Sequence, residues 1–186
     1  MPQDFNPVSA PEPFEITTFL LGRTRAWGVF EDRFGKLRRR FTVILHGHWK
    51  DDVFCLDETF KFDTGDVEVR KWLVRPSGDG RFVATCDDCV GELRGSTEPN
   101  VLRMRYKFRL DLGTTVLVVD FDDRIYRMGQ HTAVNRATMR KYGVRLGELS
   151  LFFSKVPAAM EDIDPEGFAD LVLDPAAKIQ NCNVSI

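Results

Sequence analysis

The sequence has little of what membrane segments, secretion signals and common enzyme motifs are built from. Its longest uncharged stretch, 112–119, is far too short to cross a bilayer as a helix. The first residues lack the basic start and apolar run of a signal peptide, and they hold no lipobox cysteine. We therefore expect a cytoplasmic protein, at most peripheral to a membrane and without an integral membrane segment.

The usual catalytic motifs are missing as well. There is no Gly-x-Ser-x-Gly turn and no nucleotide-binding loop, and His131 stands alone beside Gly129 and Gln130. A Ser-His-Asp hydrolase is therefore poorly supported, and the sequence predicts no cofactor. With 26 Lys plus Arg against 28 Asp plus Glu, the chain also lacks the basic excess that would indicate a nucleic-acid partner.

A single Cys-x-x-Cys pair, Cys86 and Cys89, is a fragment of a metal motif. Structural zinc needs about four protein ligands. The other candidates are His46 and His48, which share a strand face, and the distant Cys55. No second Cys-x-x-Cys and no His-x-x-x-His supports a Cys-Cys-His-His site, so the sequence predicts no metal. In the cytoplasm the four cysteines would be reduced thiols.

What the sequence does have is an almost unbroken alternation of apolar and polar residues from Arg23 to Phe153, cut by turn signals. This pattern is typical of about ten antiparallel strands joined by hairpins. No segment is long enough for a crossover helix, which excludes parallel βαβ folds. The sequence predicts an all-β fold, an antiparallel up-and-down β-barrel of the lipocalin or calycin type, and a sandwich is the alternative. The 15 Phe against three Tyr indicate an apolar interior.

We expect one domain with two appendages. Residues 1–13 hold four of the nine prolines and should form a loose arm, residues 14–156 the barrel, and residues 157–186 an acidic, irregular or short-helical tail. The stretch 13–22 predicts one or two helical turns that plug a barrel end. Residues 164–173 could form a short helix against the outside.

Two expected strands carry one charged residue each on an otherwise apolar face. Glu58 alternates with Phe54, Leu56, Phe60 and Phe62, and Arg39 alternates with Leu37, Phe41, Val43 and Leu45. The two strands should be neighbours, so the two charges could meet. A buried carboxylate needs a partner or changes its pKa. We favour an internal ion pair or a barrel-end residue that reaches water, and a polar anchor for an apolar ligand is the alternative.

A second polar cluster follows the apolar run 116–119. It contains Asp122 and Asp123, and an Arg-x-Tyr pair comes next. Fatty-acid-binding proteins hold a carboxylate with a similar late-strand pair. Asn135 and Arg136 on the following strand lie close enough to join. We favour the structural interpretation, in which Asp122 and Arg136 are cross-strand partners near a rim.

Several short motifs are distributed along most of the chain, between residues 19 and 153. They are Gly28-Val-Phe-Glu-Asp-Arg-Phe-Gly35, Arg39-Arg-Phe41, Leu56-Asp-Glu-Thr-Phe60, Arg70-Lys-Trp72, Asp87-Asp88 with Gly91, Asp122-Asp123 with Tyr126, Asn135-Arg-Ala-Thr-Met139 and Tyr142-Gly143. Through them the chain resembles a family of uncharacterised bacterial proteins, domain of unknown function thirty-eight thirty-three. The stretch 135–139 is the most distinctive of these motifs.

The resemblance implies a lipocalin-like barrel, in a family whose members often carry a lipoprotein signal, and a link to lipid metabolism or the envelope. It implies no settled activity. This chain departs from the family in lacking that signal, in having Arg124 where a Trp usually follows the Asp-Asp pair, and in carrying the Cys-x-x-Cys. The resemblance selects eight candidate binding residues: Arg39, Glu58, Arg70, Trp72, Asp122, Asp123, Asn135 and Arg136.

Alternation alone does not decide which residues of 67–73 face inward. Val67, Val69, Lys71 and Leu73 form a rival inward set. Only the resemblance favours Arg70 and Trp72.

Three functions are consistent with these residues. The leading hypothesis is a binding module whose Phe-lined cavity holds a fatty-acyl or similar hydrophobic ligand, with Arg39, Glu58 and Asp122 toward its polar end. The second is an isomerase, cyclase or hydratase of lipid or secondary metabolism that works without a cofactor and uses Glu58 or Asp122 as acid or base. The third is a solidly packed barrel that acts through its surface, for example as a homodimer.

Overall fold

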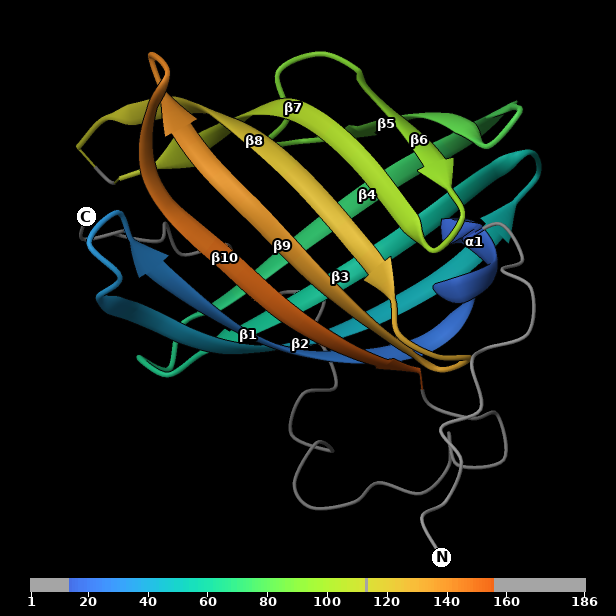
Figure 1. Cartoon of the computed structure of the whole chain (residues 1–186), viewed down its shortest axis with the longest axis horizontal. Coiled ribbons are helices and arrows are strands. Elements are labelled where there is room, and N and C mark those ends of the chain that lie inside the picture. Colours follow the sequence, from blue (N-terminus) through green and yellow to red (C-terminus); the bar gives the residue numbers. More distant parts are fainter. Residues whose placement is uncertain (1–13, 113, 156–186) are drawn as a thin grey trace, which may run out of the picture.

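The computed structural model describes residues 14–112 and 114–155, which form a closed barrel of ten antiparallel strands with one short helix (Figure 1). The elements are α1 (Ile16–Phe19), β1 (Gly22–Asp32), β2 (Leu37–Lys50), β3 (Val53–Phe62), β4 (Val67–Gly78), β5 (Arg81–Cys86), β6 (Leu93–Glu98), β7 (Val101–Asp111), β8 (Val116–Arg127), β9 (Thr132–Lys141) and β10 (Val144–Lys155). The predicted arm at 1–13, the tail at 157–186 and the helix at 164–173 lie outside the described residues.

Every strand pairs with its neighbours in sequence, and β10 returns to pair with β1, which places Trp27 opposite Phe152. Closure removes the free sheet edges that would otherwise expose unpaired backbone groups. The predicted up-and-down barrel is therefore confirmed, and a two-sheet sandwich is excluded. Among the described residues, no helix is both long and apolar enough to pass through a membrane.

Several of the hairpins form where glycine supplies a left-handed backbone, whereas Asp51 (φ 55°) and Asn100 (φ 64°) supply it between β2 and β3 and between β6 and β7. Gly35 (φ 76°) follows β1, and its N–H donates to the Asp32 carbonyl at 2.9 Å. Gly65 (φ 91°) follows β3 in the same way, with its N–H 3.0 Å from the Phe62 carbonyl. A side chain would strain this conformation, which explains why turn signals in the sequence located the strand ends so closely.

One strand begins later than its sequence predicts. The strand expected from Val90 starts at Leu93, because the preceding residues pair with β7 instead. Cys89 forms an isolated bridge with Phe108, and the Val90 N–H donates to the Lys107 carbonyl at 2.9 Å. This detour carries the Cys-x-x-Cys pair along the barrel wall.

The predicted helical plug is present as α1 at one end of the barrel (Figure 1). Phe14 and Leu20, on either side of α1, are buried in the core. A β-carbon at Gly47 would overlap the Leu20 backbone, so the close approach of the plug to β2 requires glycine there. The Lys155 ammonium donates to the Thr18 carbonyl at 3.2 Å, which ties the end of β10 to the plug.

Candidate ligand-binding cavity

The barrel interior is hollow. It encloses a cavity of about 240 Å³, whereas the third hypothesis requires a solid core. Nine of its lining residues are phenylalanines: Phe30, Phe41, Phe54, Phe60, Phe62, Phe82, Phe108, Phe121 and Phe153. The volume lies somewhat below the roughly 300–1,000 Å³ typical of small-molecule pockets. The space therefore suits one small, mostly apolar molecule.

Glu58 and Arg70 form the centre of a polar cluster in this cavity. They lie directly opposite each other on β3 and β4. Trp72, two residues further along β4 and hence on the same face, donates its indole N–H to Glu58 Oε2 at 3.0 Å. Burial raises the pKa of Glu58, while the Arg70 charge and the Trp72 hydrogen bond partly oppose the rise.

Arg70 is enclosed by rings and lacks a complete set of acceptors. Its guanidinium carbon lies 4.8 Å from the ring centre of Phe60 and 4.6 Å from that of Phe108. The carboxylates of Glu68 and Asp88 approach only to 3.7 Å. Arg70 Nε is buried and has no hydrogen-bond partner in the described part of the chain. The cavity thus contains a charged donor with unused capacity.

Asp123, Asn135 and Tyr106 add a second group of polar side chains from β8, β9 and β7. Asn135 Nδ2 donates to Asp123 Oδ1 at 3.1 Å, and the Tyr106 hydroxyl also hydrogen-bonds this carboxylate. Burial raises the pKa of Asp123 to about 6, although both hydrogen bonds oppose the rise. Burial and the nearby Asp123 charge raise the pKa of Tyr106. Asp123 also interacts electrostatically with Glu58 and Arg70, so the two groups form one polar cluster.

Arg39 lines the cavity but does not meet Glu58, contrary to the sequence-based expectation. Glu58 lies opposite Leu45, six residues beyond Arg39 and hence about 20 Å along β2. Arg39 instead lies 3.6 Å from the Asp66 carboxylate and 4.6 Å from the ring centre of Phe62. It belongs to the end of the cavity away from α1.

Asp122 and Arg136 do not reach the cavity. Successive strand residues face opposite sides, so an inward Asp123 places Asp122 outside, and an inward Asn135 does the same to Arg136. Asp122 pairs on the outer surface with Arg105 at 2.9 Å, and Arg136 pairs with Glu148 at 3.3 Å. They are not cross-strand partners either, because Asp122 lies opposite Thr138.

Two polar cavity residues, Tyr106 and Glu68, are absent from the set that the sequence predicts. The sequence does contain the signal for Tyr106, because apolar and basic residues alternate along β7. The inward residues are Leu102, Met104, Tyr106, Phe108 and Leu110. The outward residues include Arg103, Arg105, Lys107 and Arg109. Tyr106 is therefore the polar member of an apolar face. Glu68 faces the cavity because it alternates in step with Arg70 and Trp72 on β4. The sequence left open which face of this strand is the inward one.

The Cys-x-x-Cys pair lies against this cluster and not near the histidines. The sulfur atoms of Cys86 and Cys89 are 2.9 Å apart. The hydrogen bond from Cys89 lowers the pKa of Cys86, and the nearby Arg70 charge lowers it further. In the part of the chain that the structure describes, His46 and His48 group with Asp57, so the Cys-Cys-His-His arrangement does not form.

Comparison with known proteins identifies related folds. The structure of the S-type phycobiliprotein lyase CPES from Guillardia theta matches with a TM-score of 0.56 at 5% identity, over 77% of this chain and 92% of that one. A protein of unknown function from the DUF3598 family of Nostoc punctiforme matches with a TM-score of 0.56 at 12% identity, over 78% of this chain and 51% of that one. This chain thus spans about half of the Nostoc protein. At such identities the likeness shows the fold alone.

Sequence comparison gives one further finding. No curated protein matches the chain. A family model described as "Protein of unknown function (DUF3833)" matches residues 3–155.

Proposed function

The chain belongs to DUF3833, a family of proteins of unknown function, and from its cavity we propose that it binds a small hydrophobic molecule of the fatty-acyl kind. The apolar part of the ligand would lie among the phenylalanines. Its carboxylate or carbonyl oxygen would accept a hydrogen bond from Arg70. Glu58, Trp72, Asp123 and Asn135 would complete the polar end, and Arg39 would contact the ligand further along the cavity.

The observation that carries this proposal is the buried Arg70 Nε in a mainly apolar cavity, where it has no hydrogen-bond partner among the described residues. The Asp88 carboxylate lies 3.7 Å from this nitrogen, beyond hydrogen-bonding distance. A buried donor without a partner costs about 1–3 kcal/mol, and a ligand oxygen would remove that cost. A carboxylate also suits the guanidinium, because charge-assisted hydrogen bonds are the stronger kind. The cluster already holds several carboxyl groups, so an anionic ligand would favour the protonated form of Asp123.

The proposal is tested by native mass spectrometry of the protein purified from cells, followed by solvent extraction. We expect an added mass that organic solvent removes and that the extract identifies as a small apolar compound. The matched control is Ala137→Phe, which fills the cavity from an inward position on β9 and leaves the outer surface unchanged. Its retention of the native fold would be checked by circular dichroism. An unliganded wild-type protein that also takes up no fatty acid would contradict the proposal, as would equal uptake by the filled variant.

A second candidate is an enzyme without a cofactor, and the raised pKa values of Glu58 and Asp123 favour it. A buried carboxyl whose pKa is raised by desolvation suits proton transfer in an isomerase, cyclase or hydratase. Asp122, the other sequence-based candidate for this role, lies outside the cavity. The variants Glu58→Gln and Asp123→Asn separate the two functions, because an enzyme would lose turnover while still binding, whereas a carrier would change only in affinity.

The cytoplasmic location and the homodimer expected from the sequence stay predictions. Cell fractionation and sedimentation velocity would check them.

A further inference from the structure

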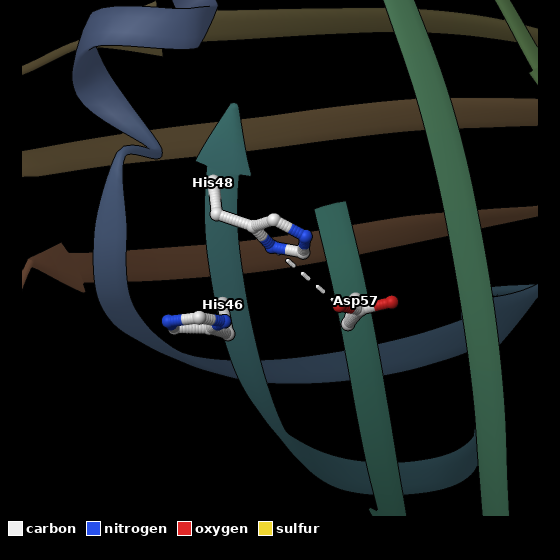
Figure 2. Close-up of side chains that lie close together, drawn as sticks. All are labelled: His46, His48 and Asp57. Carbon is white, nitrogen blue, oxygen red and sulfur yellow. Dashed lines mark ion pairs between the residues drawn. The ribbon is translucent and has the colours of Figure 1, made fainter. Parts of the chain in front are cut away.

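A group of potential metal ligands lies on the outside of the barrel, away from the cavity. His46 and His48 alternate with the inward Leu45 and Gly47 on β2, so both imidazoles face outward. Asp57 on β3 lies directly opposite His46. Figure 2 shows the three side chains gathered on one side of the two strands, with His48 and Asp57 pointing toward each other.

The distances suit a single ion after small side-chain rotations. One ligand atom from each residue lies within 4.8 Å of the other two, and the two imidazole ring centres are 5.4 Å apart. Tetrahedral zinc with bonds of about 2.0–2.1 Å places its ligand atoms about 3.4 Å apart. Bringing the three ligand atoms to this spacing therefore takes movements of roughly 1 Å, which rotations of the histidine and aspartate side chains can provide.

His48 and Asp57 are already arranged as ligands. His48 Nδ1 is enclosed and has no hydrogen-bond partner in the described residues, and it lies 3.8 Å from Asp57 Oδ2. Lys71 holds the other carboxylate oxygen, Oδ1, at 3.2 Å. Asp57 can therefore bind an ion through Oδ2 alone while Lys71 keeps the carboxylate oriented, as outer partners of metal ligands commonly do.

We propose that His46, His48 and Asp57 bind one divalent transition-metal ion of the zinc class. Two imidazoles and one carboxylate are borderline ligands that suit Zn²⁺, Ni²⁺ or Cu²⁺, whereas Mg²⁺ and Ca²⁺ prefer oxygen ligands alone. With three protein ligands, the fourth position is open to water. The ion would also join β2 to β3, so binding should stabilise the folded barrel.

The test is a titration of the untagged full-length protein with Zn²⁺ by calorimetry, and with Co²⁺ by absorption spectroscopy. The chain has three histidines, so His131→Gln, between β8 and β9, is a control matched in residue type to His48→Gln. The double variant Cys86→Ser/Cys89→Ser removes the rival thiol pair. Thermal unfolding without metal establishes that each variant folds.

We expect one Zn²⁺ per chain and a rise in melting temperature with Zn²⁺ for the wild type, the His131 variant and the double cysteine variant. His48→Gln and Asp57→Asn should weaken binding by about tenfold or more, because each removes one of three ligands. Absence of stoichiometric binding, undiminished binding by His48→Gln, or its loss in the double cysteine variant would each overturn the proposal. A thiolate charge-transfer band in the Co²⁺ spectrum of the double cysteine variant would also overturn it.

Discussion

Asp122 and Asp123 are neighbours on β8, yet their carboxylates lie in opposite environments. Asp122 faces the solvent side of the barrel wall and pairs with Arg105 and Arg124. Asp123 faces the cavity, is buried, and accepts hydrogen bonds from Tyr106 and Asn135. The barrel wall is a single β-sheet, so two successive residues of a strand place the same chemical group on opposite sides of it, one in water and one in an apolar interior.

Asn135 and Arg136 on β9 repeat this contrast. Asn135 is buried beside Asp123, whereas Arg136 pairs with Glu148 outside. The comparison teaches that the function of a polar residue in this barrel depends less on its residue type than on its parity, that is, on whether its position in the strand alternation faces the cavity or the solvent. An outward charge contributes to solubility and weak ion pairs. An inward polar group must be hydrogen-bonded or available to a ligand.

The largest expected effect that tests this comparison is a pH dependence of stability caused by Asp123. The pKa of Asp123 is raised from 3.8 to about 6 in the folded chain. Between these values the folded state holds the additional proton, so the free energy of unfolding falls as pH rises. The difference corresponds to about 3 kcal/mol, fully present below about pH 4 and lost above about pH 6.

Asp123→Asn should remove this decline because the amide does not titrate. Urea unfolding at several pH values between about 4 and 7 would show its stability relative to wild type increasing with pH. Asp122→Asn is the outer control and should keep most of the wild-type decline, because the Asp122 charge contributes less than burial to the raised pKa of Asp123. Parallel pH profiles for wild type and Asp123→Asn would contradict the burial of this carboxyl.

A smaller effect is expected when the comparison is made on β9. Asn135→Leu removes a donor from the buried Asp123 carboxylate and should destabilise the protein by about 1–3 kcal/mol. Arg136→Leu removes an exposed ion pair and should change stability by about 0.5 kcal/mol or less. Chemical unfolding of the two variants measures both. Equal losses of stability in the two variants would mean that the side of the barrel wall a residue faces does not determine the cost of replacing it.

The smallest effect concerns the cysteines near the cluster. Cys89 and Arg70 lower the pKa of Cys86, so a larger fraction of Cys86 should be thiolate at neutral pH. Iodoacetamide should modify Cys86 several-fold faster than the buried Cys55, and Arg70→Met should slow the reaction about two- to fivefold. Peptide mass spectrometry resolves the two sites. Faster modification of Cys55 would contradict this account.

The barrel could be predicted from the sequence because alternation and turn residues, which here are glycine, aspartate and asparagine, are local signals. Every hairpin position followed from them, and β6 began later than expected only because Cys89 and Val90 pair with β7. Glu58 could be placed inside because its strand face is otherwise fully apolar. The family resemblance, and not alternation, favoured Arg70 and Trp72.

Other parts of the candidate site depended on information that is not local. Arg39 and Glu58 lie on neighbouring strands, but only the register shows that they are about 20 Å apart along β2. The sequence does contain the signal that places Asp122 outside, because Leu117, Val119, Phe121 and Ile125 alternate in step with Asp123 on the apolar face of β8. The two hydrogen-bond partners of Asp123 come from the strands on either side of it, β7 and β9, and no sequence pattern brings Tyr106 to it.

The central claim is that Arg70 holds the polar group of a ligand inside the barrel, and displacement of a fluorescent fatty-acid analogue tests it most directly. Wild type, Arg70→Met and the outward control Arg136→Met would be compared for affinity. The account predicts binding about tenfold or more weaker for Arg70→Met, from loss of a charge-assisted hydrogen bond, and unchanged binding for Arg136→Met. Equal affinity of all three proteins would contradict it.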